Sequence, residues 1–164
     1  MHSIYQFLGE SWLSRQAQAI PDLFAISESL HFVGLSLLLG SLLVVDLRVL
    51  GVIRGVSYAS VMVFIWLAVV GFAINVATGA IFIATEPSLY ETNPAFQWKL
   101  ALIAVAGVNA GWFMLREHKA LADLPDDAPA PLSAKWSAGL SLSVWVLVIL
   151  CGRLLPTFAD VGGG

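Results

Sequence analysis

The chain has 164 residues, of which 59% are hydrophobic and 12% charged, and its mean hydropathy is +0.85. A soluble domain is about 45–50% apolar and about 25% charged, so this composition indicates an integral membrane protein built as one domain. The formal net charge of −3 and the lack of any basic run exclude a surface for nucleic acid.

The N-terminal segment, residues 1–21, is predicted to be a short amphipathic helix lying on the membrane surface. It lacks the basic start and apolar core of a signal peptide. The alternative is a weakly ordered leader. The C-terminal tail, residues 159–164, is rich in glycine and is expected to be disordered. The apolar residues of the leader recur at helical spacing: Ile4, Phe7, Leu8 and Trp12.

Four long apolar segments fill the rest of the chain, residues 22–158. A helix needs about 20 apolar residues to cross the hydrocarbon core, and these segments lack the period of two that membrane strands show. The predicted fold is therefore all-α, an up-down bundle of four membrane helices in which sequential helices are antiparallel neighbours. The predicted spans are about 23–45, 60–85, 95–115 and 136–155.

The links between these segments carry helix start and stop signals. Gly51–Ser57 is predicted to be a short loop, and Ala120–Pro131 is too rich in proline to be helical throughout. In the second link, Asn93 is expected to cap the third helix and Pro94 to occupy its first turn. At the end of the first segment, Asp46 and Arg48 are expected to pair locally or to cap the loop.

The distribution of basic residues predicts the orientation in the membrane. Lysine and arginine are enriched in cytoplasmic loops, and most of them here lie at the first and third links. Those two links are therefore predicted to face the cytoplasm, with both termini on the outer, periplasmic side. The residues concerned are Arg48, Arg54, Arg116, Lys119 and Lys135.

The first apolar segment contains two ionisable residues, Glu28 and His31, three positions apart on one helical face. Such side chains are costly at membrane depth and usually face a protein interior, a cavity or a cofactor. A rise of about 1.5 Å per residue places polar residues of all four segments at similar depth, in the outer half of the bundle. The predicted cluster, which would bind any cofactor, consists of Glu28, His31, Asn75, Thr78, Lys99 and Arg153.

Three interpretations of this cluster remain open. In the first, Glu28 forms a buried ion pair with Lys99 or Arg153, and His31 is a structural donor. In the second, His31 is the axial ligand of a b-type haem whose propionates lie near the two cations. Because His118 lies at the opposite end of the bundle, such a haem would be five-coordinate or take a ligand from another subunit. In the third, Glu28 and His31 hold a metal ion or relay protons.

Other candidate sites are weaker. Met114 and His118 are four residues apart and are the basis for a second ligand pair, or simply lie at the membrane interface. The single cysteine, Cys151, cannot form an internal disulfide and is expected to be a small buried apolar residue. The sequence has no phosphate-binding glycine loop, no HExxH and no GxSxG, which argues against an enzyme.

Three stretches resemble a family of small, largely uncharacterised bacterial four-span inner-membrane proteins. They are SLHFVGLSLLLGSLLVVDLRVLG (Ser29–Gly51), preceded by Glu28, then NPAFQWKLALIAVAGVNA (Asn93–Ala110), and WVLVILCGRLLPTF (Trp145–Phe158). The resemblance covers about Ser27–Phe158 and implies the four-helix fold and a bacterial inner membrane, but no activity. The bundle is also distantly similar, at the level of the fold alone, to b-type cytochromes and copper-resistance membrane proteins.

These observations favour a small integral membrane protein that acts as a non-catalytic subunit of a larger membrane assembly. The expected partners are the lipid bilayer and other membrane subunits or a second copy of the chain. One alternative is a haem-binding electron-transfer subunit with His31 as ligand. The other is a protein that handles protons or metal ions through Glu28 and His31.

Overall fold

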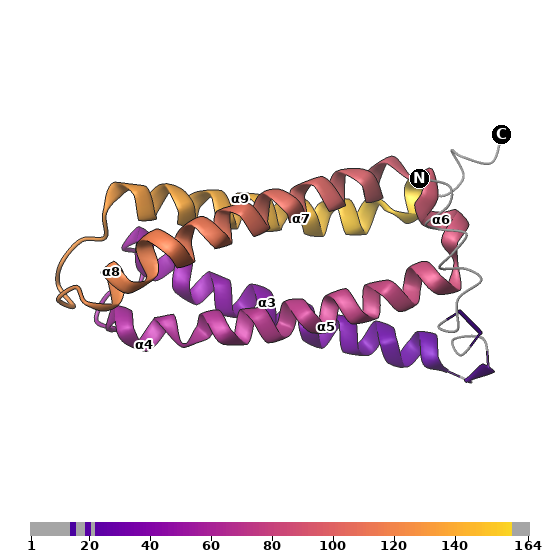
Figure 1. The fold of residues 1–164 in the computed structure, drawn as a ribbon, viewed down its shortest axis with the longest axis horizontal. Helices are drawn as coiled ribbons and strands as arrows, with labels where there is room; N and C mark the ends of the chain where they lie inside the picture. Colours follow the sequence, from indigo (N-terminus) through magenta and orange to yellow (C-terminus); the bar gives the residue numbers. More distant parts are fainter. Residues whose placement is uncertain (1–13, 16–18, 21, 159–164) are drawn as a thin grey trace.

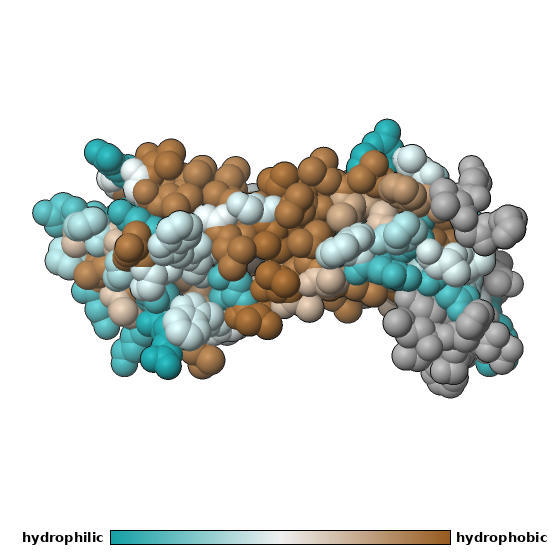
Figure 2. Space-filling view, turned by 90° about the horizontal axis from the view of Figure 1, so that it is seen from above, coloured by the Kyte–Doolittle hydropathy of each residue, from teal (hydrophilic) through white to brown (hydrophobic). Residues whose placement is uncertain are grey.

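The computed structural model describes residues 14–15, 19–20 and 22–158, and these are helical or in turns and loops, with no strand among them. The predicted surface helix 1–21, apart from its four described residues, and the tail 159–164 lie outside this part of the chain. Four helical segments are long and apolar enough to cross a membrane, which confirms the all-α, multi-pass bundle. Apolar residues form a band across the middle of the molecule, and polar residues gather at both ends (Figure 2).

The first two segments form one hairpin and the last two form another (Figure 1). The first hairpin contains α3 (Leu23–Leu50), α4 (Tyr58–Met62) and α5 (Phe64–Thr85). A short helix, α6 (Pro87–Glu91), leads to the second hairpin. That hairpin contains α7 (Pro94–Trp112), a π-helical turn η1 (Phe113–Glu117), α8 (His118–Ala122), α9 (Leu132–Leu154) and a 3₁₀ turn η2 (Pro156–Phe158).

The helices are longer than the predicted spans. The first continues from residue 45 to Leu50, through Asp46 and Arg48, and ends at Gly51, whose φ of +83° suits glycine. The third continues through η1 and α8 to Ala122. Hydropathy marks the part of a helix that suits the hydrocarbon core, whereas the backbone hydrogen bonds continue into more polar sequence.

The two hairpins pack together through α3 and α9, while α5 and α7 make no substantial contact. The prediction that all sequential helices are neighbours is therefore wrong for α5 and α7. A single aromatic contact links α5 and α9 near mid-length, where the ring centroids of Phe72 and Trp145 lie 6.3 Å apart.

The main apolar core lies at one end of the bundle, which we call the Arg48 end; it carries loops 51–57 and 123–131. Here α3, α4, α5, η1, α8 and α9 all contribute buried side chains, among them Val49, Tyr58 and Leu121. A smaller core of Ala106, Val144 and Val148 joins α7 to α9. Toward the opposite end, which carries α6 and which we call the Asn93 end, the described hairpins share no such core.

Arg48 fastens the loops at its end of the bundle. Its Nε donates to the carbonyl of Val56, its Nη2 donates to the carbonyl of Asp126 over 2.8 Å, and its guanidinium lies 3.7 Å from the ring centroid of Tyr58. The Tyr58 hydroxyl in turn donates to the carbonyl of Ala128. The expectation that Arg48 caps a loop is confirmed, but it does so for two loops and does not pair with Asp46.

Asn93 plays the corresponding role at the other end. Its Oδ1 accepts from the backbone N–H groups of Ala95 and Phe96, which caps α7 as predicted. Its Nδ2 donates to the carbonyl of Leu155 over 2.9 Å, which joins the start of α7 to the end of α9. Hydrogen bonds therefore hold both ends of the second hairpin: loop 123–131 at one end, and the start of α7 with the end of α9 at the other.

Candidate functional site

The candidate site begins where α3 and α5 cross with their backbones almost in contact. Gly34 and Gly71 face each other there, and a Cβ atom on Gly71 would lie 2.6 Å from the Gly34 carbonyl oxygen and from the Leu38 nitrogen. Only glycine allows this approach. The close crossing brings side chains one and two turns away on the two helices within hydrogen-bonding reach of each other.

His31 uses this proximity to bond Thr78. The His31 Nδ1 and Thr78 Oγ1 atoms are 2.7 Å apart, and the Thr78 hydroxyl also lies 2.8 Å from the carbonyl oxygen of Ile74. A hydroxyl has one proton, and the Ile74 carbonyl can only accept, so Thr78 donates to Ile74 and accepts from His31. His31 therefore carries its proton on Nδ1, and Nε2 keeps a free electron pair. The predicted proximity of His31 and Thr78 is confirmed.

Asn75 lies beside the same crossing. Its Nδ2 donates to the carbonyl of Gly71, one turn back on α5, and would lie 2.7 Å from a Cβ atom on Gly34. Its Oδ1 is buried and accepts no hydrogen bond within the described chain. A buried amide oxygen without a donor is unfavourable, so the site contains one unused acceptor close to the α3–α5 contact.

Lys99 approaches the site from the second hairpin. Its side chain runs over Gly152 of α9, where a Cβ atom would lie 3.6 Å from the Lys99 Nζ atom. The ammonium group interacts electrostatically with the His31 ring and with Cys151. Lys99 is half-buried and forms no hydrogen bond or ion pair with any described residue. The structure thus brings His31, Thr78, Asn75 and Lys99 together from three helices.

Glu28 and Arg153 complete the predicted set, but both are exposed. Within residues 22–158, Glu28 forms no ion pair with Lys99 or Arg153. The buried ion pair of the first interpretation is therefore wrong. The reason is helical geometry: three residues turn the helix by about 300°, which leaves Glu28 about 60° away from the His31 direction. His31 faces α5, and Glu28 is turned out of the contact.

The described residues of this site do not provide a set of metal ligands. Within the part of the chain that the structure describes, no three His, Cys, Asp or Glu side chains gather as a metal site would require. His118 begins α8, at the Arg48 end of the bundle, whereas His31 lies in the half of α3 nearer the Asn93 end, so the two histidines are remote from each other. His31 Nε2 is therefore the single atom of the cluster suited to ligate a haem iron, with Lys99 suited to a propionate.

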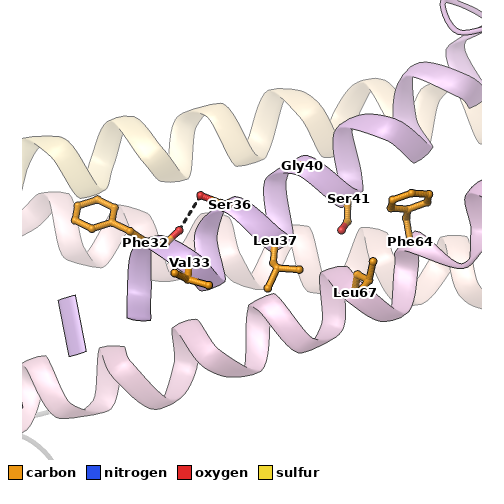
Figure 3. A pocket seen from close by; sticks show the side chains of 8 residues that line it. All are labelled: Phe32, Val33, Ser36, Leu37, Gly40, Ser41, Phe64 and Leu67. Carbon is orange, nitrogen blue, oxygen red and sulfur yellow. Dashed lines mark hydrogen bonds between the residues drawn. The ribbon is translucent and has the colours of Figure 1, made fainter. Parts of the chain in front are cut away.

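Two apolar grooves lie along α3, and neither includes His31. The larger, of about 550 Å³, opens between α3 and α5 toward mid-length (Figure 3). In that view Phe64 and Leu67 of α5 face Leu37 and Ser41 of α3, and the Ser36 hydroxyl donates to the carbonyl of Phe32. The smaller, of about 220 Å³, lies between α3 and α9. Their open apolar walls are suited to lipid chains.

The sequence reasoning missed one polar contact between the hairpins. Asp46 of α3 is 4% exposed, and Ser141 of α9 makes a side-chain hydrogen bond with its carboxyl group. A second missed contact joins α7 to α9, where Ser137 donates to Asn109 Oδ1 and Asn109 Nδ2 donates to the Ser137 carbonyl. A signal was available, because Ser137 and Ser141 are four residues apart on one face of the helix.

Comparisons with protein-family models, with curated proteins and with solved structures found no match to the chain. The resemblance of Ser27–Phe158 to small bacterial four-span proteins therefore stays a prediction.

Proposed function

We propose that the protein is a non-catalytic subunit of a larger membrane assembly, in a bacterial inner membrane with both termini on the outer side. The proposed partner is another membrane subunit or a second copy of the chain, and it packs on α7. The observation that supports this most directly is an uncovered pair of glycines, Gly107 and Gly111, on that helix.

Gly107 and Gly111 are four residues apart, the spacing at which small residues let two membrane helices approach closely. Among the described residues, no atom lies within 4 Å of a Cβ atom built on either glycine. At Gly34 and Gly71 the same kind of close packing is present, because there the opposite helix fills the space. On α7 the corresponding surface is open.

The wider environment of α7 points the same way. In its most apolar stretch only 6% of the residues are buried, against 39% in α3. Among the long helices α7 packs on α9 alone. Lys99 on this helix is half-buried and has no hydrogen-bond or ion-pair partner among the described residues, and a partner that covers α7 would supply one.

The test is the size and composition of the protein isolated from membranes in a mild detergent. We expect a stoichiometric membrane partner or a defined oligomer for the wild type, and its loss in the variant Gly107→Leu/Gly111→Leu. Gly40→Leu is the matched control, because Gly40 is also an open glycine on a long helix but lacks a second glycine four residues away. A monomeric wild type without a partner would contradict the proposal.

A second candidate function is haem binding, and one observation favours it. The Thr78 hydroxyl accepts a hydrogen bond from one ring nitrogen of His31, which orients the ring and leaves Nε2 as a ligand for iron. We expect a haem absorption band in the purified protein, or after addition of haem, that disappears in His31→Ala. Without such a band in either preparation the haem hypothesis is wrong, whereas the subunit hypothesis is unaffected.

A further inference from the structure

Asp46 occupies a position that the proposed function does not use. It lies in the last two turns of α3, 4% exposed, on the side that packs against α9. Ser141 provides a side-chain hydrogen bond to its carboxyl group. The second oxygen, Oδ2, is buried and has no hydrogen-bond partner among the described residues.

Among the described residues, no cation compensates for a charge at this position. The nearest basic residue along the chain, Arg48, is held by the carbonyls of Val56 and Asp126 and by the ring of Tyr58. On the other elements near this end of α3, the charged or titratable groups are Tyr58 on α4, Arg116 and Glu117 on η1, His118 and Lys119 on α8, and Lys135 on α9. Within the described chain none of them forms an ion pair or hydrogen bond with Asp46.

A bound metal cation would not fit this site either. Hard cations such as Na⁺ and Ca²⁺ take about six oxygen ligands, whereas Asp46 and Ser141 offer at most three. An ionised carboxylate buried without a counter-ion is strongly unfavourable, and such a group is neutralised instead. The one cation that needs a single oxygen is the proton.

We propose that Asp46 is a proton-binding site within the membrane part of the bundle, and that its bound proton keeps the α3–α9 contact neutral. The site belongs to the contact that joins the two hairpins. Loss of the proton would leave a negative charge between α3 and α9 with the Ser141 hydroxyl as its one donor. Proton release would therefore loosen the two hairpins from each other.

Infrared spectroscopy of the full chain in detergent measures the proposed proton directly, because the carbonyl stretch of a protonated carboxylic acid is separate from the carboxylate bands. At about pH 7 we expect this band in the wild type, a smaller one in Asp46→Asn, and a shift of the band in D₂O. Asp126→Asn is the control, because Asp126 is exposed in loop 123–131 and its removal leaves the band unchanged. Identical spectra for wild type and Asp46→Asn would overturn the proposal.

Thermal unfolding provides the second measurement. Because the native contact needs the neutral acid, whereas the unfolded chain releases this proton above about pH 4, the Tm of the wild type falls as the pH rises above that value. Asp46→Asn is neutral at every pH and keeps a partner for Ser141. In this variant we expect Tm to fall less over the same pH range. A wild type and an Asp46→Asn variant with the same pH profile would show that Asp46 binds no proton in this range. Neither measurement depends on a partner subunit, so failure here is distinct from failure of the proposed function.

Discussion

Replacing Gly71 by alanine tests whether the α3–α5 crossing has the backbone contact that the structure shows. The new Cβ atom would lie 2.6 Å from two backbone atoms, the Gly34 carbonyl oxygen and the Leu38 nitrogen. Backbone atoms of two packed helices cannot move aside as a side chain does. Overpacking costs about 1–3 kcal/mol, and we expect the upper end, about 3 kcal/mol. For a chain of this size that lowers Tm by about 6–12 °C.

Two further glycines provide an internal scale for this measurement. In Gly34→Ala the closest atoms belong to the side chains of Asn75 and Ile74, at 2.7 and 2.8 Å, so part of the clash can relax and the loss is smaller. In Gly79→Ala no described atom lies within 4 Å of the new Cβ, so the free energy of unfolding should stay within about 0.5 kcal/mol of the wild type. Thermal unfolding in detergent measures all three. If Gly71→Ala unfolds at the wild-type temperature, the backbone contact between α3 and α5 does not exist.

The remaining predictions concern single polar groups. Thr78→Val leaves the His31 Nδ1–H without an acceptor and should cost about 1–3 kcal/mol in thermal unfolding, whereas Thr78→Ser should restore stability; equal values for both variants would refute the bond. Asn93→Ala removes the cap of α7 and the bond to the Leu155 carbonyl, so a loss of about 1–2 kcal/mol is expected, and no loss would contradict the capping role. Burial raises the pKa of Tyr90, which lies outside the spans, so the folded state favours the neutral phenol. Stability that this phenol contributes is therefore complete below about pH 10, the ordinary tyrosine value, and is lost as the pH rises further. Tyr90→Phe should flatten that alkaline fall, and an unchanged alkaline profile would argue against it.

The fold was predictable where one local rule decides the outcome. Apolar runs long enough to cross a membrane located all four helical segments, and the Asn93–Pro94 pair located the start of α7. The helix ends at Leu50 and Ala122 were not found, because hydropathy falls before the backbone hydrogen bonds stop. The separation of α5 from α7 was not predictable either. It depends on which helices pack against α3, and the sequence does not specify that.

The candidate site divides in the same way. Helical rise alone placed Asn75 at about the depth of His31 and Thr78 one turn above, and the structure joins His31 to Thr78. The predicted buried ion pair of Glu28 was wrong because depth does not specify direction, and its side chain is exposed. Asp46 was expected to pair locally or to cap the loop because it ends an apolar run; its contact with Ser141 requires knowledge of how α3 and α9 pack.

Polar atoms without a hydrogen-bond partner distinguish a functional site from a cluster that serves only helix packing. At the two ends of the bundle, two buried polar side chains serve the structure: Arg48 holds two loops and Asn93 joins two helices. Between those ends, in the described chain, His31 Nε2, Asn75 Oδ1 and Lys99 Nζ approach from three helices and none of them has a hydrogen-bond partner. Each such group is unfavourable in a membrane protein unless something compensates for it. A cluster used only for packing would contain apolar residues at these positions, and so the same three atoms are where a partner chain or a bound cofactor would contribute its contacts.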